Sequence, residues 1–374
     1  MWMNRTTLGM IVASLVVFAC SPFPARGESD VDPILYRHVT ERAIKYLVQD
    51  GQARDGSFSR QTGPAITALA TTAILRHGRT SAEPAVRRSL EYLATFVNDE
   101  NGGIYQEGSF YQNYETSLAL ICFKAANIDG QYGKIIHDAA EFLKQLQWDQ
   151  GEGKARSDPA YGGAGYGKHG RPDLSNTSFM IEALQSIGDG DSEAVQKALL
   201  FVSRCQNLDS EHNLTEFASK NPDGGFYYTP AAGGQSQAGE TPSGGLRSYG
   251  SMTYAGLKSM IYAGVAPDDP RVKAAIEWIR QYYSLEVNPG MSAAGLFYYY
   301  HTFAKALAAL DEDQIVSADG QTHDWRDELV QELARRQLEN GAWSNQTNAR
   351  WMEGDANLVT SYALLALAYC RPDQ

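Results

Sequence analysis

Gln337-Leu-Glu-Asn-Gly341-Ala-Trp343 is the stretch of sequence that decides the fold. A glutamine, three residues, a glycine, one residue and an aromatic stand just before a wholly apolar run, Ala356 to Cys370. Gln52-Ala-Arg-Asp-Gly56-Ser-Phe58 repeats the pattern in full, and weaker glycine–aromatic loops occur at 102–105, 162–166, 224–227 and 288–290. A loop that recurs in this way indicates an internal repeat of one supersecondary unit.

Each loop follows an amphipathic segment whose charged residues share one face. In the last of these segments Trp325, Leu329, Leu333 and Gln337 step by four, which is the spacing of one helix face. Such helices have one wet side and belong on the outside of the fold. We expect them at 33–49, 84–97, 132–147, 193–206, 270–283 and 325–338.

Each loop is followed by a segment that is apolar nearly all round. A helix without a polar face must be covered on every side, so these are inner helices. Proline at the first helical position and glycine just past the end support the helix boundaries. The expected inner helices are 65–75, 116–126, 177–187, 252–262, 297–310 and 357–369.

Six outer and six inner helices that pack pair against pair close naturally into a ring. The predicted fold is therefore all-α, an α6–α6 toroid, as a single domain over residues 28–374. The two longest loops, 148–173 and 207–247, both lead into the N-termini of inner helices. Long glycine-rich loops inside a compact domain are usually functional, so a site is expected to open at that end of the ring.

The N-terminus has the pattern of an export signal. Arg5 precedes an uncharged stretch, Leu8 to Cys20, which is too short to span a bilayer and has the length of a signal-peptide apolar region. Ala25-Arg26-Gly27 offers a cleavage site before Glu28, so residues 1–27 are interpreted as a signal peptide. Val17-Phe18-Ala19-Cys20 is similar to a bacterial lipoprotein box, which leaves a lipid anchor at Cys20 open. The expected location is periplasmic or cell-envelope.

Charge and cysteine content exclude several classes of function. Removal of residues 1–27 changes the formal charge from −12 to −14, because it takes away two arginines and no acids. An acidic protein is a poor partner for nucleic acid or an anionic membrane surface, so a membrane is expected only through the possible anchor. Cys122, Cys205 and Cys370 are scattered, two of them in apolar helix patterns, and predict buried thiols rather than disulfides or a metal set.

The glycine–aromatic loops between paired helices resemble the repeats of squalene and oxidosqualene cyclases and of protein prenyltransferase β subunits. The resemblance covers the whole mature chain, and residues 337–343 and 52–58 match its motif in full. It implies a toroid with a central apolar cavity, in which the glutamine and the aromatic tie neighbouring helix ends together. An isoprenoid or another apolar small molecule is the ligand that this resemblance implies.

Neither catalytic apparatus of that superfamily is complete here. The cyclases place a proton-donating aspartate in the middle of an Asp-x-Asp-Asp run, but in Asp173-Leu-Ser175-Asn176 serine stands at that position. The prenyltransferases hold zinc with aspartate, cysteine and histidine. Tyr300-His301-Thr302 resembles their histidine motif, while the upstream Asp-Gly-Cys is missing. No metal and no cofactor are therefore predicted.

Three inner helices each carry one charged residue in an otherwise apolar or aromatic run: Glu182, Lys258 and Lys305. One interpretation is an ion pair between Glu182 and Lys258 that ties the barrel together, with Lys305 reaching towards the mouth. The other is a polar patch in the cavity wall that binds a ligand head group, with His301 one turn from Lys305 on the same face.

Aromatic residues gather near the starts of the inner helices and would suit an isoprenoid ligand. Tyr249 and Tyr254 are the two most strongly expected to face the cavity. Tyr300 and Trp351 are further candidates, although aromatic residues also fill any large core. Additional tyrosines of this group are Tyr114, Tyr298, Tyr299 and Tyr362.

Acidic residues near the expected mouth have two interpretations. Asp355 or Asn357 is most simply the N-cap of the last inner helix. Glu353 with Asp173 would form a carboxylate pair that acts as general acid and base on a glycan. The function hypotheses are thus a lipid-binding, cyclase-like protein, a non-catalytic binding or scaffold module, and a carbohydrate-active enzyme. An apolar cavity would favour the lipid-binding protein, and a filled centre would favour the scaffold module. A cleft with paired acids would favour the carbohydrate-active enzyme.

Overall fold

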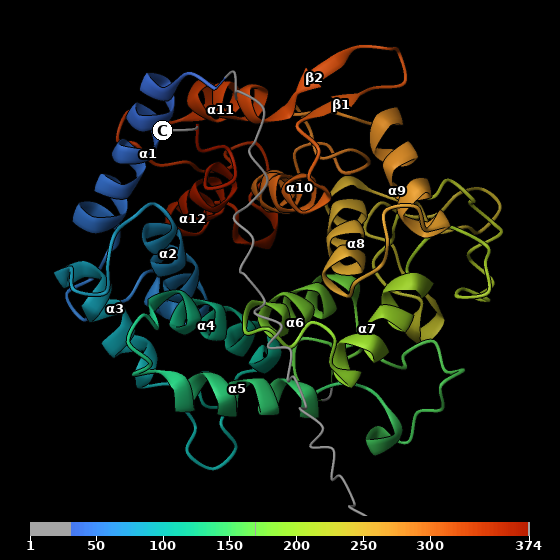
Figure 1. The fold of residues 1–374 in the computed structure, drawn as a ribbon, viewed down its shortest axis with the longest axis horizontal. Helices are drawn as coiled ribbons and strands as arrows, with labels where there is room; N and C mark the ends of the chain where they lie inside the picture. Colours follow the sequence, from blue (N-terminus) through green and yellow to red (C-terminus); the bar gives the residue numbers. More distant parts are fainter. Residues whose placement is uncertain (1–30, 169, 373–374) are drawn as a thin grey trace, which may run out of the picture.

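The computed structural model describes residues 31–168 and 170–372. Within them twelve α-helices form two concentric rings (Figure 1). The inner helices are α2 (Ala65–Arg76), α4 (Gln112–Ala126), α6 (Leu174–Ser186), α8 (Gly250–Tyr262), α10 (Leu296–Leu310) and α12 (Ala356–Leu367). The outer helices are α1 (Pro33–Tyr46), α3 (Pro84–Ala94), α5 (Gly133–Gln145), α7 (Glu193–Arg204), α9 (Pro270–Gln281) and α11 (Trp325–Arg336).

The inner ring is closed, because α12 packs against both α10 and α2. Each remaining inner helix packs in the same way against the inner helices before and after it. Burial follows the predicted division, since every residue of α12 from Leu358 to Leu367 is buried. The predicted all-α toroid is confirmed.

Four glutamines carry out the same task around the ring. Each side-chain amide donates one hydrogen bond to the glycine carbonyl of its own loop and another to a carbonyl of the following outer helix. Gln147, for example, donates to Gly162 O and to Ala194 O, each at 2.8 Å. The others are Gln52, Gln206 and Gln337. The glutamine of the repeat is thus a cross-link between successive units.

The glycine of the repeat is required for two reasons. Gly341 has φ +90°, which side chains disfavour, and a Cβ there would lie 2.5 Å from the carbonyl oxygen of Arg42 on α1. Gly162 meets Lys197 on α7 in the same way, at 1.9 Å. Only a residue without a side chain lets the loop approach the neighbouring helix this closely.

Threonines on five inner helices fix the loops from the other side, a contact that the sequence pattern did not reveal. Thr360 Oγ1 accepts a hydrogen bond from the backbone N–H of Trp343 at 3.0 Å. Equivalent bonds join Thr67, Thr116, Thr177 and Thr253 to the loops before their helices. Five of the six loops are therefore held to an inner helix, and a glutamine also holds four of these to an outer helix.

Some local features differ from the predictions. A short antiparallel hairpin, β1 (Gln314–Val316) with β2 (Thr322–Asp324), connects α10 to α11 where only a loop was expected. After α1 the chain continues as a π-helical turn, Leu47–Gly51. No helix in the described part of the chain is long and apolar enough to cross a membrane. The proposed signal peptide and Cys20 lie outside the described residues.

Candidate functional site

A cavity of about 490 Å³ lies at the centre of the ring, where the inner helices begin. All six inner helices contribute to its wall from their first turns. The two long loops contribute as well, through Tyr166 from one and Tyr228 and Gln237 from the other. The cavity thus opens at the end of the toroid that the loop lengths predicted.

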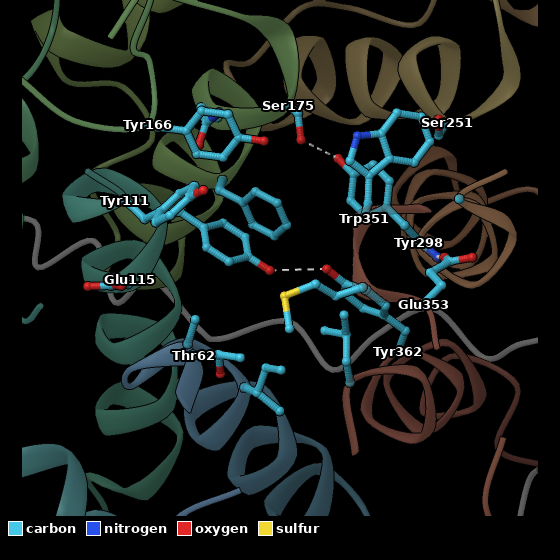
Figure 2. Close-up of a pocket in the computed structure, with 18 of the residues that line it drawn as sticks. Thr62, Tyr111, Glu115, Tyr166, Ser175, Ser251, Tyr298, Trp351, Glu353 and Tyr362 are labelled. Atoms are coloured by element: carbon cyan, nitrogen blue, oxygen red, sulfur yellow. Dashed lines mark hydrogen bonds between the residues drawn. The ribbon is translucent and has the colours of Figure 1, made fainter. Parts of the chain in front are cut away.

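Aromatic rings from four inner helices form its floor (Figure 2). The hydroxyls of Tyr114 on α4 and Tyr362 on α12 meet at 3.1 Å across the barrel. Phe179 on α6 packs edge-on against Tyr114, with ring centroids 5.1 Å apart. Tyr298 on α10 lies beside Tyr362 and hydrogen-bonds to Ser175 at 2.9 Å. Aliphatic side chains of Ala65, Ile66, Met252 and Leu358 complete the lining.

The mouth carries partly exposed aromatics. Tyr111 and Tyr166 contact each other edge-on on one side, and Trp351 faces them from the other (Figure 2). Trp351 and Met352 both adopt positive φ values, 56° and 65°, which cost free energy in residues with side chains. The indole lies over Gly295, where a Cβ would be only 3.1 Å from the ring.

A polar bridge holds the Trp351 segment in place. Arg350 stacks on the indole at 4.2 Å and donates a hydrogen bond to Gln237 of the long loop 207–247 at 2.7 Å. This contact joins two distant loops over the cavity. It also explains how an exposed tryptophan keeps a fixed position there.

Glu353 lines the cavity, but its oxygens are fully engaged. Oε1 accepts from the backbone N–H groups of Phe297 and Tyr298, and Oε2 accepts from Asn345 at 2.6 Å. Burial raises the pKa of this carboxyl to about 6, and these hydrogen bonds oppose the rise. Glu353 therefore caps the first turn of α10, whose own N-cap residue, Gly295, has no side chain to do so.

Asp173 is the N-cap of α6. Its Oδ1 accepts from the backbone N–H of Asn176 at 2.9 Å, and its Oδ2 accepts from the Asn176 side chain at 2.8 Å. Burial raises its pKa to about 6, and the bonds from Asn176 oppose this. Asp173 does not line the cavity, so the structure does not pair it with Glu353 across the mouth.

The buried charges lie beneath the cavity floor. Glu182 binds Lys258 through Oε2 at 2.8 Å and binds Lys305 through Oε1. All three side chains are almost wholly buried. The predicted pair between Glu182 and Lys258 is thus present. Lys305 does not reach towards the mouth, because the same carboxylate holds it inside the barrel.

His301 lies next to this cluster, not on the ligand cavity. Its ring is 5.3 Å from that of Tyr362, and neither ring nitrogen has a hydrogen-bond partner. Burial, assisted by Lys305, holds its pKa well below the usual value, so the imidazole is neutral. With Lys305 and Glu182 it lines a separate void of about 10 Å³.

Three of the predicted site residues line the cavity: Tyr249, Trp351 and Glu353. Tyr254 was expected there but points between α8 and α10, where it packs on Tyr299 and Phe303. Tyr300 points outwards and donates its hydroxyl to Leu285 O. His301, Lys258 and Lys305 lie too deep, one or more turns below the residues that reach the cavity. Helix spacing alone assigned these side chains to a common face and could not give their depth.

The sequence interpretation also missed several lining residues. Tyr166 and Tyr228 come from the long loops, and Phe179 and Asn176 from the start of α6. Tyr166 and Tyr228 each follow a pair of adjacent glycines within a few residues, and this pattern could have identified them. For Phe179 and Asn176 no pattern distinguished a wall position from the packed core.

The squalene-hopene cyclase C-terminal domain family matches residues 61–229. Among solved structures, the type II terpene cyclase MstE from Scytonema, in complex with its substrate geranylgeranyl dihydroxybenzoate, aligns with 90% of this chain and 98% of its own. The identity is 11% and the TM-score 0.56. The chain has a terpenoid cyclase-like fold. No curated protein sequence matches it.

This terpenoid cyclase-like fold is shared with enzymes of other chemistry. A glycosyl hydrolase family 88 protein from Bacteroides vulgatus aligns over 89% of this chain and 98% of its own, with 11% identity and a TM-score of 0.53. A protein from Actinoplanes aligns with 16% identity and a TM-score of 0.51, over 90% of this chain and 99% of its own. At these identities the likeness shows the fold, and function must be argued from the cavity.

In the run Asp173-Leu-Ser175-Asn176, serine stands at the position of the aspartate that the cyclase motif would place there. Ser175, at the middle position of the Asp-x-Asp-Asp-like run, lines the cavity and bonds to Tyr298. A serine hydroxyl is far too weak an acid to protonate an alkene. Among the described residues no group of three His, Cys, Asp or Glu side chains is placed to hold a metal ion.

Proposed function

We propose that this protein binds a neutral, isoprenoid-like small molecule in the aromatic cavity at the centre of its toroid. The observation that carries the proposal is the lining itself. Rings of Tyr114, Phe179, Tyr298, Trp351 and Tyr362 surround about 490 Å³ of space, a size typical of small-molecule sites. A scaffold protein would have a filled centre.

The charge of the lining supports a neutral ligand. Of the described residues, no lysine, arginine or histidine lines the cavity, so nothing there would neutralise a diphosphate. The two acids on the wall, Glu115 and Glu353, already accept hydrogen bonds from the protein. A prenyl diphosphate is therefore a poor candidate, and a hydrocarbon or a neutral prenyl derivative fits better.

The proposal assigns binding without protonation-initiated cyclisation. Such cyclisation requires an acid where Ser175 stands, and Asp173 is occupied as a helix cap. Native mass spectrometry of the gently purified protein should reveal a bound apolar molecule. Incubation with squalene or geranylgeraniol, followed by gas chromatography, should return the unchanged compound. Protein that contains no bound molecule and binds neither compound would contradict the proposal. A cyclised product would contradict the statement that the protein does not catalyse protonation-initiated cyclisation.

A carbohydrate ligand is the second candidate, because a glycosyl hydrolase shares the fold and exposed aromatics ring the mouth. General acid and base catalysis on a glycan would need two free carboxyl groups. Glu353 is committed to α10 and Asp173 to α6. An oligosaccharide binding screen separates the two candidates, since saturable glycan binding with no uptake of isoprenoids would favour the second.

We also propose that the ligand is acquired in the cell envelope. The support is the sequence of residues 1–27, with Arg5, the apolar stretch and the cleavage site before Glu28. Intact-mass measurement of the protein from its native host should give a mature N-terminus at Glu28. An acylated N-terminus at Cys20 would instead establish a lipoprotein, and a retained Met1 would exclude export by this signal.

A further inference from the structure

Asn176 lines the cavity, and its side chain carries a buried acceptor without a partner. Its side chain is 1% exposed, and its Oδ1 has no hydrogen-bond partner. Other buried polar atoms in the described chain also lack partners, but Asn176 is the only such residue that lines the cavity. A buried acceptor without a partner costs about 1–3 kcal/mol, so a structure rarely retains one without a reason.

The orientation of this amide is fixed by its neighbour. Asn176 Nδ2 donates to Asp173 Oδ2 at 2.8 Å, and the backbone N–H of Asn176 donates to Asp173 Oδ1 at 2.9 Å. A pKa of about 6 leaves the Asp173 carboxyl ionised at neutral pH, so it accepts and does not donate. A flipped amide would place its oxygen against that carboxylate. Oδ1 is therefore held away from Asp173 as an acceptor.

The surroundings of Asn176 suit a hydroxyl group. Tyr166, Tyr228 and Ser175 line the same part of the wall, and all of them carry hydroxyls that both donate and accept. Ser175 is engaged with Tyr298, the Tyr228 hydroxyl is engaged with the Asp173 carboxyl, and the Tyr166 hydroxyl lies within hydrogen-bond range of the Asn176 side chain. Aromatic rings form the floor. The cavity thus has a polar patch around Asn176 above an aromatic floor.

We propose that Asn176 accepts a hydrogen bond from a hydroxyl group of the ligand, so that the preferred ligand is an isoprenoid alcohol rather than a hydrocarbon or an ether. This inference rests on the proposed function and specifies its ligand class. The hydroxyl lies against Asn176 and Tyr166, and the hydrocarbon skeleton fills the aromatic remainder. A skeleton without a donor leaves Oδ1 unpaired or traps a water molecule beside it, and either outcome weakens binding.

Three probes with one skeleton test the inference: geranylgeraniol, its methyl ether, and the hydrocarbon in which hydrogen replaces the hydroxyl. The ether keeps the oxygen but loses the donor. The alcohol should bind the mature protein about tenfold more tightly than either of the others, as expected for one buried hydrogen bond. In Asn176→Ala this preference should fall to about onefold, while in the control Ser178→Ala, on the same helix but not on the cavity, it should persist.

The outcomes separate the inference from the function on which it rests. Equal binding of all three probes would overturn the alcohol preference and leave the isoprenoid site in place. Failure of all three to bind would overturn both. Because Asn176→Ala removes a bond to the α6 cap and is at risk of misfolding, a crystal structure of the wild-type protein with geranylgeraniol gives an independent answer. The ligand oxygen should lie within hydrogen-bond distance of Asn176 Oδ1, and a hydroxyl placed elsewhere would overturn the inference.

Discussion

Gln337 Nε2 donates a hydrogen bond to the carbonyl oxygen of Val39 at 2.9 Å, across 298 positions of the sequence. The same amide binds Gly341 O at 2.9 Å, and its Oε1 accepts from Arg42 at 3.1 Å. These bonds join the last repeat to α1 and so close the outer ring (Figure 1). The same glutamine bonds that join neighbouring repeats elsewhere in the ring join the last repeat to the first at this point.

Gln337→Leu should therefore destabilise the protein by about 1–3 kcal/mol, because two carbonyls and the Arg42 guanidinium lose a partner. Urea unfolding followed by circular dichroism measures the change. Gln331→Leu is the matched control, since Gln331 on α11 is exposed and bonds only to Asp327 on its own helix. Equal losses of stability in the two variants would show that the bonds of Gln337 contribute no more to stability than a surface hydrogen bond does.

Glu182→Gln should cost about 3–5 kcal/mol of stability, because it leaves the ammonium groups of Lys258 and Lys305 buried without their carboxylate. Denaturant unfolding at neutral pH measures the loss. Glu193→Gln provides the contrast, since Glu193 pairs with Lys197 at 2.9 Å but is 82% exposed. That exposed pair is worth under about 1 kcal/mol. A loss of similar size at both positions would contradict the account of the buried cluster.

Lys305 should make stability depend on pH above neutrality. Burial lowers its pKa from 10.5 to about 8, and Glu182 opposes the shift. Between these two values the unfolded chain holds the lysine proton and the folded chain has lost it, so stability rises with pH in that window. From pH 7 to pH 9 the expected gain is about 1 kcal/mol.

The comparison with Lys305→Met isolates this contribution. Methionine is close in length and keeps the pair between Glu182 and Lys258, so the variant should lack the rise while other groups titrate as before. Unfolding free energies of both proteins at pH 7, 8 and 9 supply the test. Parallel pH profiles would mean that Lys305 keeps its ordinary pKa in the folded state.

Trp351→Ala should weaken binding of geranylgeraniol roughly tenfold, because an aromatic wall is removed from the mouth of the cavity. The fold should tolerate the change, since the indole is 43% exposed. Isothermal titration calorimetry or fluorescence of a reporter ligand gives the affinity. Tyr282→Ala, on the outer ring of helices, is the control, because the Tyr282 side chain is 48% exposed and lies away from the cavity. A Trp351 variant with unchanged affinity would remove the mouth from the proposed site.

The sequence by itself determined the toroid, because the repeat is local chemistry. A glutamine, a glycine and an aromatic at fixed spacing specify one turn and its contacts with the next helix, and apolar periodicity separates the inner from the outer helices. It also located the open end of the ring, because the longest loops had to lie there. The glycines at 78, 188 and 264 do end inner helices in a left-handed conformation, as predicted.

The tertiary structure alone decided which side chains face the ligand cavity. His301 and Lys305 share a helix face with Tyr298 but lie beneath the floor formed by Tyr114 and Tyr362, and depth along a helix has no signature in sequence spacing. Glu353 looked like a catalytic acid until its bonds to the start of α10 were visible. Whether a polar group already has hydrogen-bond partners depends on residues from distant repeats. These residues become neighbours only when the ring closes.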